Sequence, residues 1–316
     1  MIRCAPVLIT TVNRYHHFRN CLESLSRCGL AEKTDVYVAV DYPPSKKYWE
    51  GYNKIKEYLD TCGTLGFLSL NITYRERNYF YSRGGNMRPL RDEVLKKYDT
   101  VICTEDDNIF SPNFLVYMNK GLEKFKNDKT VLAINGYCHI FPLKYYKNNF
   151  MRHDVFFSVW GFGIWKDRIE LLDEKCNVSH FRKVFFHPHK MARLLMSSPT
   201  NLISFFKSIL RTGGLTDSIL SVFMVVENKC VIMPIVSKVR NCGFDKSGEH
   251  SLNDEVSRML SLQKIDDNTD FEYEGDGFEC FKENHRIMID RELDKPTLKK
   301  CYLKIKKELF KNTSGI

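Results

Sequence analysis

Short continuous apolar runs alternate with helically spaced apolar positions along the N-terminal half of the chain. Continuous runs of this kind are typical of buried parallel strands, and they cover residues 5–12, 35–42, 65–76 and 99–104. Apolar residues three and four positions apart predict helices between these runs, over residues 18–28, 47–63 and 85–98. Alternating strands and helices predict an α/β fold with a mostly parallel central sheet and helices on both faces.

The pattern of the second half is less regular. It predicts strands over residues 129–137, 155–165 and 230–239, and helices over 188–211 and 216–229. A polar, glycine-containing loop, "RNCGFDKSGEHS", follows at residues 240–251, and the chain is polar and Lys-rich from about residue 280 onward. We expect this half to add a helical region beside the sheet.

Polar side chains follow three of the predicted parallel strands. Thr11 and Asn13 come after the first strand, Asp41 after the second, and the acids 105–107 after the fourth. Ligands of open parallel sheets bind outside the carboxyl ends of the strands. The sequence therefore predicts one polar edge of the sheet that receives a ligand.

The stretch "CTEDDNIFSPNF", residues 103–114, allows two interpretations. The acids could form a solvated turn before a helix that has Ser111 as its N-cap and Pro112 in its first turn. They could instead hold Mg²⁺ or Mn²⁺, which prefer carboxylate oxygens and bridge to ligand phosphates. Their place after a fourth parallel strand favours the metal site.

Composition narrows the classes of function. The chain has 316 residues, 43% of them hydrophobic and 28% charged, which excludes a disordered protein. Its net charge of +9 suits nucleic acid, anionic membranes or phosphate-bearing ligands. The eleven cysteines form no C-x-x-C pair, which favours reduced thiols of a cytosolic enzyme over disulfides or zinc. We expect neither a signal peptide nor a membrane span.

Four segments together resemble GT-A-fold glycosyltransferases, in particular bacterial family 2-like enzymes of surface-polysaccharide assembly. The N-terminal half is also distantly similar to the N-acetylglucosaminyltransferase I group. The segments are "PVLITTVNRYHHFRNCLESL", "VICTEDDNIFSPNFL" with its variant of the DXD motif, "SVWGFGIWKDR", and "TDSILSVFMVVENKCVIMPIVSKVRNCGFDKSGEHS". The resemblance spans residues 5 to about 252 and implies transfer of a sugar from a nucleotide diphosphate sugar.

The resemblance also implies site residues. It places Asp107 and His250 at a divalent metal ion, and Glu105 in support of the loop. The positions matched to the nucleotide sugar are Thr10, Thr11, Asn13, Arg14, Asp41, Arg83, Gly85, Asn86, Asp106 and Lys246. For Asp41 a turn acid ahead of two prolines, and for His250 a histidine without any ligand role, are the open alternatives.

The acceptor side is matched in the second half. Asp217 corresponds to the base that removes a proton from the acceptor hydroxyl in inverting transfer, although Asp217 or Thr216 could instead cap a helix. Trp160, Gly161 and Phe162 correspond to an aromatic acceptor wall, with plain core packing as the alternative. We thus expect a nucleotide-sugar-binding half at 1–136, an acceptor-binding and catalytic half at 137–255, and an extension with a basic helix at 256–316.

A basic segment lies within the second half. It has six Lys and Arg and no acid between Arg182 and Arg211. Such a segment can dock on anionic lipid or pack on the sheet as an ordinary helix, and the sequence leaves both open.

The sequence as a whole predicts a metal-dependent, inverting glycosyltransferase with Mn²⁺ or Mg²⁺ as cofactor. Its donor is expected to be a UDP-sugar, and its acceptor a glycan or lipid-linked glycan of a bacterial surface polysaccharide or lipopolysaccharide. We expect a cytoplasmic protein that binds no nucleic acid, with contact to the membrane left open. The alternatives are a nucleotidyltransferase, against which the glycine-free "TTVNRYHHF" counts, and a non-catalytic basic protein that binds lipid or nucleic acid.

Overall fold

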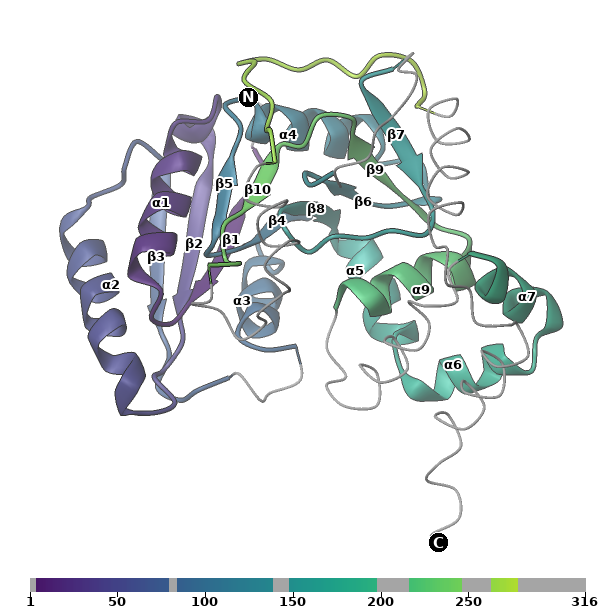
Figure 1. The fold of residues 1–316 in the computed structure, drawn as a ribbon, viewed down its shortest axis with the longest axis horizontal. Coiled ribbons are helices and arrows are strands. Elements are labelled where there is room, and N and C mark those ends of the chain that lie inside the picture. The colour runs from purple at the N-terminus through teal and green to yellow at the C-terminus, as the bar shows by residue number, and fades with distance from the viewer. Residues whose placement is uncertain (1–3, 80–83, 139–147, 198–215, 246–262, 278–316) are drawn as a thin grey trace, which may run out of the picture.

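An eight-stranded sheet forms the centre of the molecule (Figure 1). The computed structural model describes residues 4–79, 84–138, 148–197, 216–245 and 263–277. The sheet has the order β3-β2-β1-β4-β8-β6-β9-β7. Its strands are β1 (Val7–Thr11), β2 (Asp35–Val40), β3 (Ser69–Tyr74), β4 (Thr100–Glu105), β6 (Val131–Asn135), β7 (Phe150–His153), β8 (Phe162–Trp165) and β9 (Cys230–Pro234).

The first four strands are parallel, as the alternating pattern predicted. β1 pairs in parallel with both β2 and β4, and β2 with β3. β8 enters antiparallel between β4 and β6, β9 is parallel to β6, and β7 closes the far edge antiparallel to β9. The mostly parallel α/β fold is confirmed.

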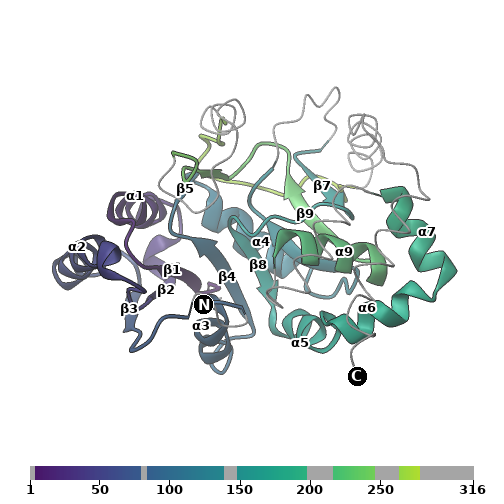
Figure 2. The same ribbon diagram turned by 60° about the horizontal axis from the view of Figure 1, so that its bottom comes forward.

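Helices cover both faces of the sheet (Figures 1 and 2). One face carries α1 (Tyr15–Ser26), α2 (Trp49–Thr61) and α4 (Phe114–Lys124). The other carries α3 (Met87–Val94), α5 (Lys166–Lys175), α6 (Val178–Phe185), α7 (Pro188–Ser197) and α9 (Asp217–Glu227), of which the last four form the expected helical region. Short 3₁₀ helices, η1 (Ala31–Lys33) and η2 (Lys46–Tyr48), flank β2.

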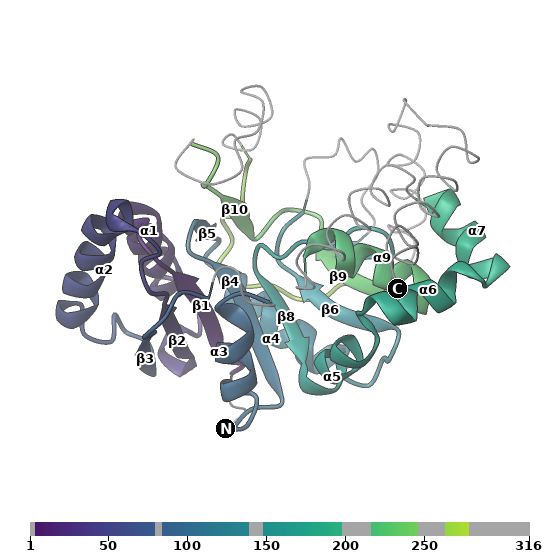
Figure 3. The same ribbon diagram turned by 90° about the horizontal axis from the view of Figure 1, so that it is seen from below.

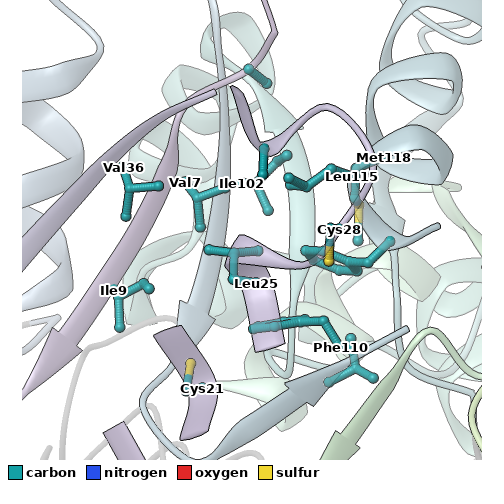
Figure 4. Packing of buried hydrophobic residues seen from close by; sticks show 14 of the residues in the cluster. Val7, Ile9, Cys21, Leu25, Cys28, Val36, Ile102, Phe110, Leu115 and Met118 are labelled. Carbon is teal, nitrogen blue, oxygen red and sulfur yellow. The ribbon is translucent and has the colours of Figure 1, made fainter. Parts of the chain in front are cut away.

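The alternation of side chains along β1 divides the core into two layers. Val7 and Ile9 are fully buried against α1, whereas Leu8 is buried on the opposite face. Figure 4 shows the first layer, in which Leu25 of α1 and Ile102 of β4 meet the β1 side chains. Because successive strand residues point to opposite faces, the residues that continue β1 and β4 beyond the core must also separate between the two faces.

A second, two-stranded ribbon lies beside the sheet edge that carries the acids. β5 (Asn108–Phe110) pairs antiparallel with β10 (Val239–Asn241) and packs on α1. The prediction of Ser111 as a helix N-cap is wrong: α4 begins at Phe114, after Asn113, and the Ser111 hydroxyl bonds Asn113 Oδ1 at 2.9 Å. Three residues are too short a run for the hydrophobic pattern to indicate β5, and its insertion moves the helix start along the chain.

Several elements of the second half differ from the sequence prediction. The predicted strand at 155–165 forms only as β8, and its first part is buried without regular structure. The predicted strand at 230–239 is split between β9 and β10, and β7, α5 and α6 were not predicted. The predicted helix at 188–211 begins as α7, and the remainder lies outside the described residues, as does the tail from residue 278.

Residues 263–277 cross the back of α4 as an extended segment. Tyr273 stacks on Tyr117 and its hydroxyl donates to the Tyr117 carbonyl oxygen at 2.9 Å, in a gap that exists because residue 121 is glycine. Asp266 accepts from Asn113 Nδ2 at 2.9 Å and pairs with the ammonium group of Lys238, a lysine only 1% exposed. The segment thereby holds Lys238, the residue directly before β10, in place.

Two further expectations concern cysteines and membrane spans. All nine cysteines in the described ranges are free thiols. Among the helices of the described part, none combines the length and apolar character that crossing a bilayer requires.

Candidate active site

The carboxyl ends of β1 and β4 present their polar side chains to opposite faces of the sheet. Thr10 and Glu105 are paired in the β1–β4 register and line one cavity on the α3 side. The next residues, Thr11 and Asp106, meet on the α1 side, where the Thr11 hydroxyl donates to Asp106 Oδ2 at 2.7 Å. The three acids of the motif therefore do not form one cluster.

Arg14 neutralises two of these acids. Its guanidinium group donates through Nη2 to Asp106 Oδ1 and lies with Nη1 2.7 Å from Asp107 Oδ2. The side chain of Arg14 is 22% exposed, whereas those of the two aspartates are 5% and 8% exposed. Burial raises the pKa of Asp106, against the lowering effect of Arg14, and the two aspartates raise the pKa of Arg14 further above its ordinary value. Repulsion between the adjacent acids is thus relieved by a residue just beyond β1.

The β5–β10 ribbon holds Asp107 from the other side. Asn241 Nδ2 donates to Asp107 Oδ1 at 2.7 Å, and the Cys242 amide donates to the Asp107 carbonyl oxygen at 2.8 Å. A Cβ atom on Gly243 would lie 2.1 Å from Asp107 Oδ2. The glycine at this position therefore permits close contact between the loop backbone and the carboxylate.

Asp217 lies at the first residue of α9, close to Glu105. Thr216 is the N-cap of the helix, with its hydroxyl oxygen accepting from the Ile219 amide at 3.4 Å, so Asp217 is not needed as a cap. The Asp217 carboxylate accepts from the Val159 amide at 2.7 Å, and burial raises its pKa to about 6. Burial, together with the charges of Asp107, Asp217 and Asp106, raises the pKa of Glu105 to about 8. A carboxylate that titrates near neutrality can accept a proton from a substrate hydroxyl.

A cavity of about 180 Å³ opens between α3, α5 and the start of α9; we call it the α3–α5 cavity. Figure 3 shows α3 and α5 side by side below β4 and β8. The walls of the α3–α5 cavity are mostly apolar and are formed by Met87, Cys103, Val159, Phe162, Ile164, Ile169, Leu172, Cys176 and Leu220. Its polar lining is Thr10, Arg88, Arg91, Thr104, Glu105 and Asp173.

Asp41 and Asn86, two residues matched to the nucleotide, form hydrogen bonds to backbone groups of neighbouring segments. Both carboxyl oxygens of Asp41 accept from the Tyr79 amide, at 3.0 and 3.2 Å, and burial raises the Asp41 pKa. Asn86 is buried, donates to the Ala39 carbonyl oxygen at 3.0 Å, and accepts from Arg75 Nε at 2.8 Å. These bonds join the loop after β3 and the start of α3 to the end of β2, beside the sheet edge.

The aromatic segment between β7 and β8 contacts the loop after β10. The Trp160 ring packs edge-on against Tyr137 and Phe244, with centroids 4.7 and 5.5 Å apart. Gly161 has a φ of +73°, and a Cβ there would come within 2.9 Å of Val239. Phe162 lines the α3–α5 cavity. Trp160 is half-buried, so part of it remains available to a ligand.

The remaining predicted residues lie at the margin of the site or outside the described ranges. The Asn13 carbonyl oxygen accepts from the Tyr15 amide and lies against Gly51 of α2, and Gly85 has a φ of +58° with open space around its Cα. Arg83, Lys246 and His250 fall outside the described residues. Among described side chains, no group of three or more His, Cys, Asp or Glu is arranged to hold a metal ion.

Sequence reasoning overlooked two parts of the site. Asn241 occurs in the "N-x-GF" part of a segment that supports the family resemblance, yet its bond to Asp107 has no signal in a single sequence. The separation of Thr10 from Thr11 could have been derived from the two-residue period of a strand, but both were assigned together to the nucleotide.

Comparison with known proteins gives only distant structural similarity. No family model matches the chain, and no curated protein matches its sequence. The mannosyltransferase PcManGT from Pyrobaculum calidifontis, in complex with GDP-Man and Mn²⁺, aligns over 55% of this chain and 47% of its own, with 17% identity and a TM-score of 0.36. S. aureus TarS aligns over 46% and 24%, with 15% identity and a TM-score of 0.29.

A third similar structure covers more of the chain. It is a proposed glucose-1-phosphate thymidylyltransferase from Bacillus anthracis in complex with a sucrose, aligned over 87% of this chain and 99% of its own. Its identity is 13% and its TM-score 0.40. The chain thus spans less than half the length of the first two proteins.

Proposed function

We propose that the protein is a glycosyltransferase that moves a sugar from a nucleotide diphosphate sugar to a glycan or lipid-linked glycan. One observation carries the proposal, which is that two charged groups lie on opposite faces of the sheet at its ligand-binding edge. The first consists of the Arg14 cation with the carboxylates of Asp106 and Asp107. The second is the acidic pair Glu105 and Asp217. The first group suits a diphosphate, and the second suits a reacting hydroxyl.

The donor atoms of the first group fit a divalent ion that arrives together with a diphosphate. Each carboxyl oxygen of Asp107 receives one hydrogen-bond donor, from Asn241 or Arg14. A carboxylate offers about four lone-pair sites, so two remain on Asp107. Mg²⁺ and Mn²⁺ are commonly bound by one or two carboxylates, with waters and substrate phosphates completing the shell. When bound, such an ion would neutralise charge on the departing diphosphate.

Arg14 gives the site its own counter-charge. Its guanidinium group has five N–H donors in a planar fork that matches phosphate oxygens as well as carboxylates. Because it is the most exposed member of the group, it can turn toward a diphosphate while Thr11 keeps its bond to Asp106. We propose that Arg14 exchanges carboxylate for phosphate contacts when the donor binds.

Asp217 is the proposed base. In inverting transfer the acceptor oxygen attacks the anomeric carbon, its proton passes to a carboxylate, and the bond to the diphosphate breaks. The Val159 amide fixes one oxygen of Asp217, and the raised pKa makes the carboxylate a stronger proton acceptor than an exposed aspartate. The neighbouring Glu105 and Val159 both line the α3–α5 cavity.

The finer parts of the proposal come from the resemblance and the composition. These parts are UDP as the carrier nucleotide, a role in bacterial surface polysaccharide or lipopolysaccharide, and a cytoplasmic location with contact to the membrane. Trp160, Gly161 and Phe162 are proposed for the acceptor side. Arg83, Lys246 and His250 remain proposed donor or metal ligands.

Nucleotide binding tests the proposal directly. We expect one of UDP, GDP, TDP and CMP to raise the melting temperature, with a larger shift when Mn²⁺ is present. A shift with nucleoside triphosphates and sugar phosphates alone would favour nucleotidyl transfer, and no shift with any nucleotide would refute both activities.

Two substitutions test the assigned roles. Asp107→Asn and Asp217→Asn should each suppress transfer, measured as nucleotide release with acceptor present, by about 10²–10⁴-fold, the range typical of lost acid–base or electrostatic catalysis. Asp99→Asn is the matched control, because Asp99 is exposed and lies before β4, at the end of the strand opposite to the acids. Full activity of both variants would contradict the proposal.

A further inference from the structure

The α3–α5 cavity lies beside the proposed site, and most of its lining has no part in the proposed reaction. It meets the proposed donor site at Glu105 and Thr10 and at Val159, whose amide holds Asp217. Away from these residues its walls are mostly apolar, with Cys176 and Leu220 among them, and Arg88, Arg91 and Asp173 form a charged part of the lining. A ligand group that enters from the reacting edge therefore meets a cavity whose lining is mostly apolar.

The two arginines that line the cavity are already paired with acids. Arg91 Nη2 lies 2.7 Å from Asp92 Oδ1 and 3.1 Å from Asp173 Oδ2, and Arg88 lies 3.7 Å from Asp173. These pairs leave little positive charge for a phosphate. Among the described residues, no side-chain hydrogen bond reaches the carboxyl group of Glu105. Glu105 is thus the polar group at the mouth that a ligand would satisfy.

The lining discriminates between kinds of sugar substituent. A hydroxyl group moved from water into an apolar wall loses its hydrogen bonds and is penalised, whereas a methyl group gains from leaving water. Carboxyl groups at a cavity mouth bond an amide N–H or a ring hydroxyl well. A plain hexose donor carries only hydroxyl and hydroxymethyl substituents besides the diphosphate, and it has no apolar group to fill the interior.

We infer that the donor sugar carries an apolar substituent, an N-acyl group or the methyl group of a 6-deoxy sugar, that enters the α3–α5 cavity while Glu105 bonds the adjacent polar group. This inference rests on the proposed function, because it places the donor sugar at the β4 edge. It adds a substrate class that neither the acids nor Arg14 determine.

Matched donors test the inference. UDP-N-acetylglucosamine against UDP-glucose examines the N-acyl group, and TDP-6-deoxyglucose against TDP-glucose examines the deoxy methyl group. We expect one substituted donor to exceed its plain partner by at least about tenfold in kcat/KM, as is usual when one small apolar group gains a pocket. Equal or greater kcat/KM with the plain hexose in both pairs would overturn the inference while leaving the glycosyltransferase proposal in place. Failure of every nucleotide and every donor would overturn both.

A substitution in the apolar wall of the cavity provides a second test. Cys176→Phe should remove the preference for the substituted donor and leave the affinity for free UDP or TDP unchanged, because Cys176 lies in the cavity and not beside Arg14. Cys176→Ala is the control and should retain the preference. Melting temperatures establish that both variants fold, and a preference that survives in folded Cys176→Phe would also overturn the inference.

Discussion

Removal of the Arg14 charge should destabilise the protein by leaving two adjacent aspartates without their cation. Arg14→Met keeps most of the side-chain stem and deletes both ion pairs, to Asp106 and Asp107. Breaking a buried pair by removing one partner costs about 3–5 kcal/mol. Because the Arg14 side chain is 22% exposed, water can replace part of the lost interaction, and we expect a loss of about 2–4 kcal/mol.

The expected loss translates into a measurable change in melting temperature. An unfolding entropy of about 2.1 cal/mol/K per residue gives about 0.66 kcal/mol/K for the 316 residues. The Arg14→Met protein should therefore melt about 3–6 °C below the wild type at pH 7, in thermal unfolding followed by circular dichroism. Arg14→Lys, which keeps the charge but loses the planar fork, should lose less.

The pH dependence separates this explanation from a simple packing defect. Burial raises the pKa of Asp106, so its carboxylate gains a proton as the pH falls, and a neutral carboxyl group does not need the guanidinium. The difference between Arg14→Met and wild type should thus be largest at neutral pH and shrink toward about pH 4. An Arg14→Met protein that melts within about 1 °C of wild type at pH 7, or a difference independent of pH, would refute the reasoning.

Three further predictions follow from the described contacts. Glu227→Gln should destabilise the protein by about 2–3 kcal/mol at pH 7, measured by urea unfolding. The reason is that bonds to Lys175, Lys190 and His180 lower the Glu227 pKa to about 2. The stability that these bonds contribute is present above the unfolded pKa and is lost as the pH falls through about 2. Gly243→Ala should lower kcat/KM by about 10–100-fold at nearly unchanged stability, since the new Cβ must displace the loop from Asp107. The logarithm of the transfer rate should rise with pH and level off above about 6, where Asp217 ionises; a flat profile through this range would exclude Asp217 as the base.

The first half of the fold could be predicted because its hydrophobic pattern is unambiguous. β1 and β2 are continuous apolar runs, and the helix between them has apolar residues at helical spacing, so strand and helix were correctly distinguished. The prediction for the second half failed where an apolar run does not form a single strand. Residues 155–165 are apolar enough for a long strand, but Gly161 adopts a φ of +73° and only β8 extends beyond it.

The position of the site could be predicted, but its internal division could not. Parallel strands place Thr11, Asp41 and the acids at one edge of the sheet whatever the details of packing. Which cation faces the acids depends on tertiary contacts: Arg14 lies 92 positions from Asp106 in sequence, and several other basic residues were equally plausible partners. The contact of Gly243 with Asp107 likewise depends on how two short strands pair.

The ion pair between Lys238 and Asp266 has a consequence for the order in which the protein folds during synthesis. Lys238 is 1% exposed, and the carboxylate it contacts belongs to a residue 28 positions further along the chain. While the ribosome has released Lys238 but still holds Asp266, burial of this ammonium group is unfavourable. The β5–β10 ribbon, and with it the support of Asp107, should therefore be completed only after residues 263–277 have emerged. Chains shortened before Asp266 should form the four parallel strands but lack a finished site.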